Sequence, residues 1–328
     1  MDGQGDAGDS LSANSVRNVR FILREDFRIV LGLIVAAGKE DDVNYYSLTF
    51  NSTIMKKVLI IFGGEQFSDG AFEFARGMNE LEPIMLSGVF VPYMTYINLV
   101  TYAAVPMGGA GFVPLEKEET QSVTQNVEMF EKRCRDNGIA FRSHFNITEF
   151  GLSELEVQTR FSDLMIISSE KFYQDIVGED AEDYLRDVLR TAECPVVIVP
   201  ERHEFPLRNV FAYDGSTASL FAARQFMYLF PKLCWHHPST IVYAKDEPDE
   251  IPLESGIREL AEVHLPTHDF LKLDLDQKKH FSSWIGKQRR SILIGGFSGK
   301  PRIGKLFGKN ALNEVVAEHL LPVFMARR

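Results

Sequence analysis

Two segments in the second half of the chain carry residue types that could bind a sugar and an anion. Asp214-Gly215-Ser216 follows the apolar run Asn209–Tyr213, and a carboxylate in that position can accept hydrogen bonds from a ribose or an adenine amine. A second segment begins at Gly295-Gly296 and continues to Asn310. It carries four basic residues, Lys300, Arg302, Lys305 and Lys309. Because a glycine-rich loop leading into a helix presents backbone N–H groups to an anion, these two segments are the candidates for a phosphate-binding site.

Other chemical motifs fail on a specific residue or spacing. Gly299–Leu306 matches the phosphate-binding P-loop, except that Leu306 stands where a Ser or Thr must hold magnesium. Cys234, His236 and His237 lack a second ligand pair at zinc-finger spacing, so we expect a surface loop there and no metal site. No nucleophile elbow, HExxH motif or Ser/His/Asp order is present. We therefore predict no catalytic residues and no metal ligands; the protein is not expected to be an enzyme, although weak ATPase activity stays open.

Composition limits the class of protein. The chain has 328 residues, of which 45% are hydrophobic and 25% charged, as in ordinary globular proteins. Its formal net charge of −11 repels phosphate backbones, so we expect no nucleic-acid partner. Three scattered cysteines suit a reducing compartment. A cytoplasmic protein without a membrane partner is the expectation.

The first 54 residues read differently from the rest. Residues 1–16 are mostly Gly, Asp, Ser, Asn and Gln, a composition typical of a disordered tail. Ile29–Gly38 is strongly apolar, but its length of about 10 residues falls short of the ~20 needed to span a bilayer. A signal peptide is disfavoured by the acidic residues ahead of it. We expect either an accessory helix or strand packing on the main body, or an extension upstream of a natural start at Met55; whether 1–54 belongs to the mature protein is left open.

From Met55 onward the chain repeats itself. The run Lys57–Phe62 followed by helical spacing over Ser68–Leu81 reappears about 152 residues later as Asn209–Tyr213 followed by Thr217–Phe230. Each unit predicts a strand, a turn and a helix.

The closing units of the two copies also correspond, at an offset of about 127 residues. Leu164–Ser168 and Pro195–Pro200 match Ile292–Gly296 and Pro322–Ala326, each pair being separated by a loop and a helix. The smaller offset places an insertion at 93–114 in the first copy. The predicted organisation is an extension over 1–54, a first domain over 55–204 and a second over 205–328.

Within each copy, buried strands alternate with helices. The remaining predicted strands are Ile84–Val91, Ile139–Phe145, Ser239–Lys245 and His268–Leu273, and the remaining helices are Glu116–Asn137, Leu253–Val263 and Gln277–Gln288. Apolar strands separated by helices are typical of a doubly wound parallel sheet. We therefore predict an α/β protein with two tandem doubly wound parallel-sheet domains of five strands each. Ligands of such folds bind at the carboxyl ends of the strands, where the strand order reverses.

A strand ending in Asp-Gly-Ser, a GxxG loop followed by another Gly, and a closing helix followed by a Pro-Val strand resemble the universal stress protein family. Two fused copies are similar to its tandem bacterial members, and the resemblance covers residues 55–328. It implies an adenine nucleotide alpha hydrolase-like fold. It also implies that the two domains pack as an internal pseudo-dimer through Val196–Val199 and Val323–Met325.

Family members that bind ATP carry Gly, two residues, Gly, nine residues, Gly, then Ser or Thr. Here eight residues separate Gly299 from Gly308, and the hydroxyl position is Lys309 or Asn310. The resemblance implies that ATP or another adenine nucleotide is the cofactor of the second domain. The implied site residues are Asp214, Gly215, Ser216, Tyr243, Gly296, Gly299, Gly308, Lys309 and Asn310. The alternative is that Asp214 caps the following turn or helix and that the glycines only form a tight loop.

The first copy departs further from that pattern. Gly63-Gly64 replaces the Asp, and the loop after Ser168-Ser169 carries six carboxylates, Glu170, Asp175, Glu179, Asp180, Glu182 and Asp183. Carboxylates at short range repel a triphosphate, so we expect this copy to bind no nucleotide.

The resulting functional expectation is a non-catalytic stress-response protein that binds a nucleotide or a regulatory partner. Two alternatives stay open: a nucleotide-hydrolysing or nucleotidyl-transferring enzyme on the same fold, and a nucleotide-free protein–protein scaffold. The sequence does not name the regulatory partner, and it leaves open whether two chains form a homodimer.

Overall fold

A computed structural model describes residues 20–23, 29–32, 47–48, 55–63, 66–91, 117–145, 152–171, 188–243, 251–273, 281–297 and 315–327. The chain divides into two units, Met1–Ile54 and Met55–Arg328. In the first unit, β1 (Arg20–Leu23), β2 (Ile29–Gly32) and β3 (Ser47–Leu48) pair antiparallel in that order. The apolar stretch after Ile29 thus begins as a strand, whereas the tail expected over 1–16 lies outside the described residues.

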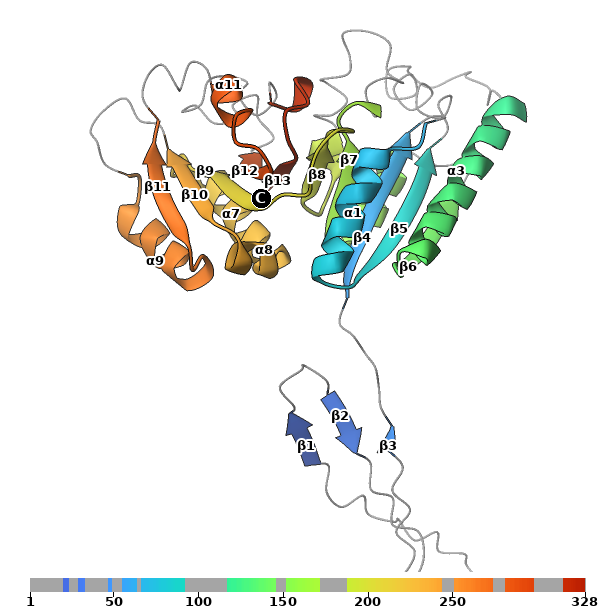
Figure 1. Cartoon of the computed structure of the whole chain (residues 1–328), viewed down its shortest axis with the longest axis horizontal. Coiled ribbons are helices and arrows are strands. Elements are labelled where there is room, and N and C mark those ends of the chain that lie inside the picture. Colours follow the sequence, from blue (N-terminus) through green and yellow to red (C-terminus); the bar gives the residue numbers. More distant parts are fainter. Residues whose placement is uncertain are drawn as a thin grey trace, which may run out of the picture. The chain divides into compact units, whose positions relative to one another are not determined.

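The second unit is built on one sheet with the order β11-β10-β9-β12-β13-β8-β7-β4-β5-β6 (Figure 1). Neighbouring strands run parallel except β8 and β13. The first copy supplies β4 (Lys56–Gly63), β5 (Ile84–Val91), β6 (Ala140–Phe145), β7 (Leu164–Ser168) and β8 (Val196–Val199). The second supplies β9 (Arg208–Ala212), β10 (Ser239–Tyr243), β11 (His268–Lys272), β12 (Ser291–Phe297) and β13 (Val323–Arg327). The predicted α/β fold is confirmed, with five strands from each copy, but the two sets of strands form one mixed, mostly parallel ten-stranded sheet.

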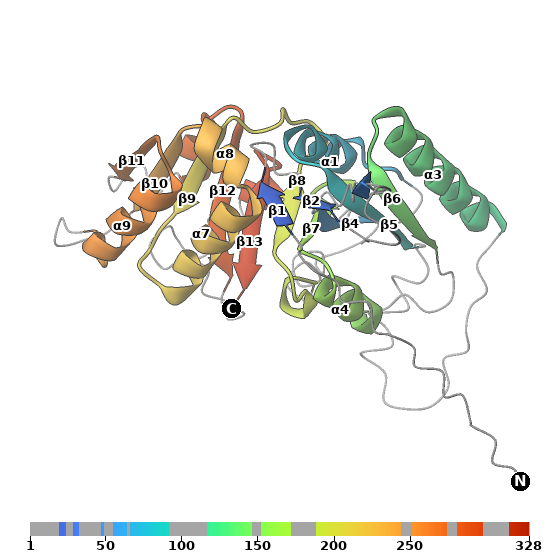
Figure 2. The same cartoon turned by 90° about the horizontal axis from the view of Figure 1, so that it is seen from below.

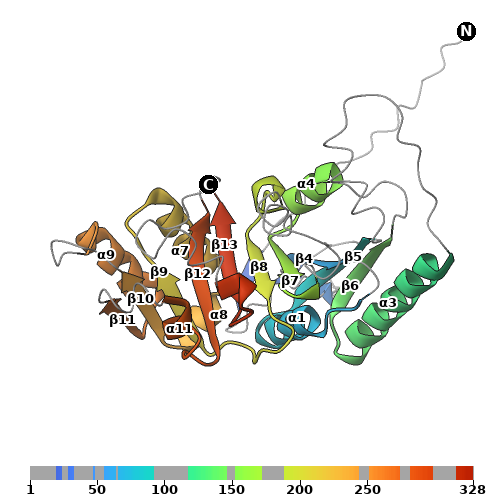
Figure 3. The same cartoon turned by 90° about the horizontal axis from the view of Figure 1, so that it is seen from above.

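The two copies join through their last strands, which lie side by side in the middle of the sheet (Figure 3). Val197 pairs with Phe324, and the flanking pairs are Ile198 with Val323 and Val196 with Met325. The register is therefore symmetric about Val197 and Phe324. Packing of the copies as an internal pseudo-dimer through these strands is confirmed.

Helices cover both faces of this sheet. The strand side chains of one face pack against α1 (Asp69–Leu81), α3 (Lys117–Asp136), α7 (Thr217–Leu229), α8 (Pro231–His236) and α9 (Glu254–His264). The other face packs against α4 (Leu152–Arg160), α11 (Phe281–Ile285) and residues near 188 and 315. We call the junction between β8 and β13 the seam. Across it α1 and α8 lie side by side (Figure 2), and Lys232 Nζ donates to the carbonyl oxygen of Leu81 at 2.6 Å. None of the helices described here is long and apolar enough to cross a membrane.

The expectation of a surface loop at Cys234–His237 was wrong. Residues 231–236 form α8, with Pro231 at its first turn, where the missing N–H of proline costs no hydrogen bond. Leu233 and Cys234 are buried and anchor the helix to the core. The predicted helix over Gln277–Gln288 is seen as α11, Phe281–Ile285; residues 274–280 lie outside the described part.

A linker of residues 200–207 connects β8 to β9 and holds His203 in a largely apolar setting. The ring centroid of His203 lies 6.0 Å from that of Phe74, and His203 Nδ1 donates to the carbonyl oxygen of Pro200 at 2.9 Å. Burial lowers the pKa of His203 below 6.5, against weaker opposing effects of Pro200, Glu201 and Glu73. The imidazole is therefore held neutral.

This burial makes the free energy of unfolding sensitive to acid. As the pH falls through about 6.5, the unfolded chain takes up the His203 proton before the folded chain does. The stability that depends on neutral His203 is present above that pH and is lost as the pH falls through the folded pKa. Urea unfolding between about pH 7 and about pH 5 should show a shallower loss for His203→Gln, whose amide keeps a donor for Pro200. An identical dependence of the unfolding free energy on pH in wild type and His203→Gln would contradict this assignment. Burial also lowers the pKa of His237, which therefore contributes in the same direction in both proteins.

Candidate functional site

The strand order of the second copy reverses between β9 and β12. From β9 the chain continues to β10 and β11 on one side, and it then crosses to β12 and β13 on the other side of β9. Asp214 lies just beyond the carboxyl end of β9. Gly296 is the next-to-last paired residue of β12, opposite Ala326 of β13. Open parallel sheets bind ligands in the crevice at such a switch point. The structure thus brings two of the predicted site residues to that crevice.

Asp214 organises a tight turn. Its Oδ1 accepts a hydrogen bond from Ser216 N at 2.9 Å, and among the described residues its Oδ2 has no hydrogen-bond partner. Gly215 has φ +75°, and a Cβ there would lie 2.4 Å from Pro252 Cβ, so both the backbone conformation and the space require glycine. The capping alternative is therefore correct for one oxygen of Asp214, while the other oxygen has no partner in the part of the chain that the structure describes.

Ser216 begins α7. Its Oγ accepts a hydrogen bond from Ser219 N at 3.1 Å, the bond of an N-cap residue. Ser219 Oγ donates to the carbonyl oxygen of Ser216 at 3.0 Å, and Asp214 N donates to Ser219 Oγ at 3.5 Å. These bonds tie the turn to the first turn of the helix. Ser219 was missed by the sequence reasoning, although its position three residues after an N-cap serine is a signal that could have found it.

Gly296 lets the end of β12 touch the same helical turn. A Cβ at this position would lie 2.3 Å from Ala218 C and 2.5 Å from Ser219 N. Asp214, Ser216 and Gly296 therefore meet at the start of α7. This close approach by itself requires a glycine at position 296, whether or not a ligand binds.

We expect Gly296→Ala to lower the free energy of unfolding by about 1–3 kcal/mol, because the added methyl group pushes against helix backbone. Gly256→Ala is the matched control: a Cβ there meets nothing within 4 Å, and within a helix Ala is favoured over Gly by up to about 1 kcal/mol. Chemical denaturation of both variants measures the difference. If Gly296→Ala were as stable as the control, the contact between β12 and α7 would not be as close as described.

Tyr243 ends β10 and is only 9% exposed, so its side chain belongs mainly to the core. Neighbouring Tyr213, missed from the sequence, donates its hydroxyl to the carbonyl oxygen of Pro252 at 2.7 Å. The cavity beneath α7 beside these strands measures about 10 Å³, room for roughly one water molecule. A ligand at this crevice would therefore lie outside the core, on the turn. Gly299, Gly308, Lys309 and Asn310 lie outside the described residues.

The first copy has different residues at the equivalent positions. Counting from the strand pairings, Gly63 takes the place of Asp214 and Ser168 takes the place of Gly296. Ser68, like Ser216, caps the following helix, with Ser68 Oγ accepting from Ala71 N at 3.1 Å. The helix cap is thus shared by both copies, whereas the carboxylate and the glycine are not.

A carboxylate of the chain itself lies on the crevice of the first copy. Glu201 Oε1 accepts from Ser68 Oγ at 2.5 Å and from Ser168 Oγ at 2.6 Å, and Glu201 Oε2 accepts from Gly70 N at 3.0 Å. We name Ser68, Gly70, Ser168 and Glu201 the glutamate clasp. Sequence reasoning missed it; the loop carboxylates from Asp175 to Asp183 on which that reasoning relied lie outside the described residues.

The described residues show no second kind of reactive centre. Burial raises the pKa of the three thiols, Cys134, Cys194 and Cys234, to about 12, so they are protonated near neutral pH. Within the same part of the chain, no three His, Cys, Asp or Glu side chains gather closely enough to hold a metal ion.

Comparison with known proteins supports the fold. No family model and no curated protein matches the sequence. A universal stress protein from Archaeoglobus fulgidus DSM 4304 is similar in structure, with a TM-score of 0.56 and 13% identity over 82% of this chain and 98% of that one. A functionally unknown protein from Pseudomonas aeruginosa PAO1 gives a TM-score of 0.51 and 12% identity over 84% and 93%. The chain therefore has an α/β fold that resembles the fold of a universal stress protein over most of its length.

Proposed function

We propose that this protein is a non-catalytic, cytoplasmic stress-response protein whose second copy binds an adenine nucleotide while its first copy does not. The observation that carries the proposal is the contrast between two equivalent crevices. In the second copy, Asp214 Oδ2 has no partner among the described residues, beside Gly296 at the switch point. In the first copy, the glutamate clasp already places a carboxylate on the helix start.

The chemistry of this crevice suits recognition more than turnover. A carboxylate oxygen can accept hydrogen bonds from the hydroxyls of a ribose. The described residues around Asp214 offer hydroxyl and backbone groups, with no His, Lys or second carboxylate in hydrogen-bond contact with Asp214 or Ser216. The protein would act by presenting a nucleotide-dependent surface to a regulatory partner, as a single chain or as a pair of chains.

Calorimetric titration of ATP, ADP and AMP tests this function. Wild type should bind one adenine nucleotide per chain, and Asp214→Ala should weaken binding at least tenfold, as expected for losing a hydrogen bond to a charged group of about 1.5–3 kcal/mol. Asp136→Ala removes the same charge from the exposed surface pair with Lys132 and should bind like wild type.

Two results would overturn the proposal. The absence of heat for every nucleotide would favour a nucleotide-free scaffold. Phosphate release measured in parallel, if it proceeds steadily and disappears in Asp214→Ala, would identify a nucleotide-hydrolysing enzyme.

A further inference from the structure

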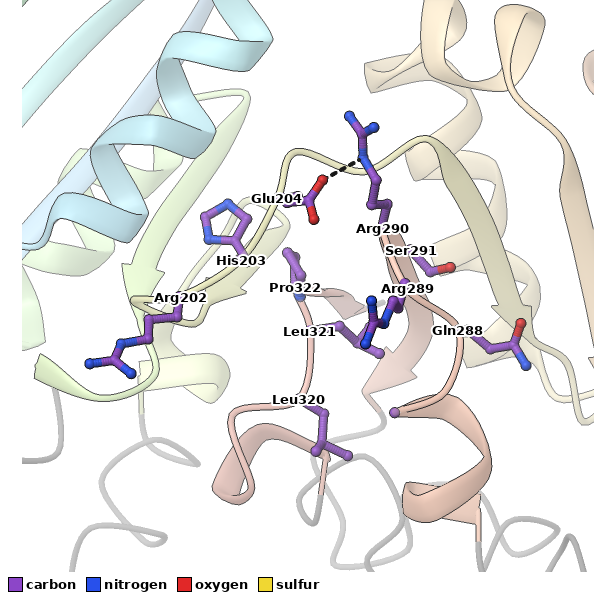
Figure 4. A pocket seen from close by; sticks show the side chains of 11 residues that line it. Arg202, His203, Glu204, Gln288, Arg289, Arg290, Ser291, Leu320, Leu321 and Pro322 are labelled. Atoms are coloured by element: carbon purple, nitrogen blue, oxygen red, sulfur yellow. Dashed lines mark ion pairs between the residues drawn. The ribbon is translucent and has the colours of Figure 1, made fainter.

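A second concave site lies away from the Asp214 crevice, where the linker passes the amino ends of β12 and β13 (Figure 4). This seam groove has a volume of about 420 Å³. Its walls come from three segments far apart in sequence: Arg202–Glu204 on the linker, Gln288–Ser291 before and at the start of β12, and Leu320–Pro322 before β13. Its size falls in the range of about 300–1,000 Å³ typical of small-molecule sites.

The seam groove is cationic in a protein of net charge −11. Arg202, Arg289 and Arg290 all line it, against the single carboxylate of Glu204. Arg290 Nε pairs with Glu204 at 3.1 Å, whereas the guanidinium groups of Arg202 and Arg289 have no hydrogen-bond or ion-pair partner among the described residues. Figure 4 shows the guanidinium of Arg202 pointing away from Arg289, so Arg289 supplies the available guanidinium of the groove and Arg202 lies at its edge.

The backbone that carries these arginines is held in place. Arg290 has φ 55°, a left-handed conformation that a non-glycine residue adopts at a cost. Its carbonyl oxygen accepts from Leu207 N at 2.7 Å and from Arg208 N at 3.1 Å, which joins the linker to the start of β12. The next residue, Ser291, is 1% exposed, and its Oγ is a buried hydroxyl without a partner among the described residues. The groove thus has a fixed backbone frame.

We propose that the seam groove binds a small phosphate ester with an apolar body. A guanidinium group matches phosphate oxygens in bidentate geometry, and Arg289 would supply it, with the charge of Arg202 at the edge of the groove adding attraction. Leu320, Leu321 and Pro322 supply the apolar wall against which the body of the ligand packs. Nucleic acid does not fit this description, because a long polyanion would meet the repulsion of the whole acidic surface.

Fluorescence titration with 1-naphthyl phosphate tests the site on the full chain. Wild type should bind one molecule per chain, and neutral 1-naphthol should bind at least tenfold more weakly because the arginines recognise the phosphate. Arg289→Gln should weaken binding at least tenfold, and Arg202→Gln should act in the same direction. Arg224→Gln, which removes a charge from the exposed side of α7, is the matched control and should bind like wild type.

A variant with the opposite effect makes the proposal more demanding. Glu204→Gln removes the carboxylate that pairs with Arg290, so 1-naphthyl phosphate should bind several-fold more tightly. No saturable binding to wild type, or equal affinity of wild type and Arg289→Gln, would overturn the proposal. Loss of binding in Asp214→Ala would instead place the probe in the crevice of the proposed nucleotide site; the seam groove predicts unchanged binding in that variant, and it stands or falls independently of nucleotide binding.

Discussion

Phe324→Ala is expected to lower the free energy of unfolding by about 3–5 kcal/mol, among the largest effects for any single truncation in the sheet. Phe324 is fully buried and pairs with Val197 on the symmetric register of the seam. Its ring packs edge-on against Phe226 at 5.2 Å and Phe230 at 6.1 Å. Truncation therefore removes buried apolar surface and two aromatic contacts, and it leaves a cavity in the core.

Urea unfolding, followed by far-ultraviolet circular dichroism, measures this loss. Phe161→Ala is the control, because that ring is 68% exposed and its removal should change the free energy by less than about 0.5 kcal/mol. A loss below about 1 kcal/mol for Phe324→Ala would mean that the two copies do not depend on the seam for stability.

Glu201→Ala should lower the free energy of unfolding by about 2–3 kcal/mol, since each hydrogen bond to a charged group contributes about 1.5–3 kcal/mol and Glu201 is partly exposed. The substitution leaves the buried hydroxyls of Ser68 and Ser168 without their acceptor and exposes the N–H of Gly70 at a helix start. An external anion can replace the lost carboxylate there. Sulfate at constant ionic strength should therefore raise the melting temperature of Glu201→Ala more than that of wild type.

Glu259→Ala serves as the control for this experiment, because Glu259 is exposed on α9 and its removal changes the net charge equally. Equal responses of Glu201→Ala and Glu259→Ala to sulfate would show that the helix start does not accept an anion. Unchanged stability of Glu201→Ala would contradict the glutamate clasp.

The sequence predicted the strands closely because each is an apolar run bounded by Gly, Pro or polar residues. Ile84–Val91 and Leu164–Ser168 agree with the structure at both ends. The helices over Ser68–Leu81 and Thr217–Phe230 were predicted from apolar residues at helical spacing, and in the structure each follows a capping serine, Ser68 or Ser216. α8 was missed because the six residues from Pro231 are too few to show helical periodicity.

The candidate site could be predicted only in part. The positions of Asp214 and Gly296 at the crevice could be predicted because strand ends are visible in the sequence and parallel strands present them at one edge. The glutamate clasp joins Glu201 to Ser68 across 133 residues, and such a contact depends on sheet order and side-chain direction that no local pattern contains. The seam groove has the same origin: its three walls are brought together only when β8 and β13 pair.

That antiparallel pairing also determines which edges the sheet shows to other molecules. Unpaired strand edges are templates for aggregation, and β8 and β13 are short, buried, almost wholly apolar strands that would be hazardous if exposed. Each copy covers the hazardous edge of the other. The two edge strands of the described sheet are β6 and β11. They carry polar and charged residues such as Arg142, His268, Asp269 and Lys272, which disfavour edge-to-edge pairing with a strand of another molecule. Because β8 and β13 belong to one chain, their pairing is intramolecular and does not depend on a second molecule. Fusion of the copies thus disfavours self-association through these apolar edges.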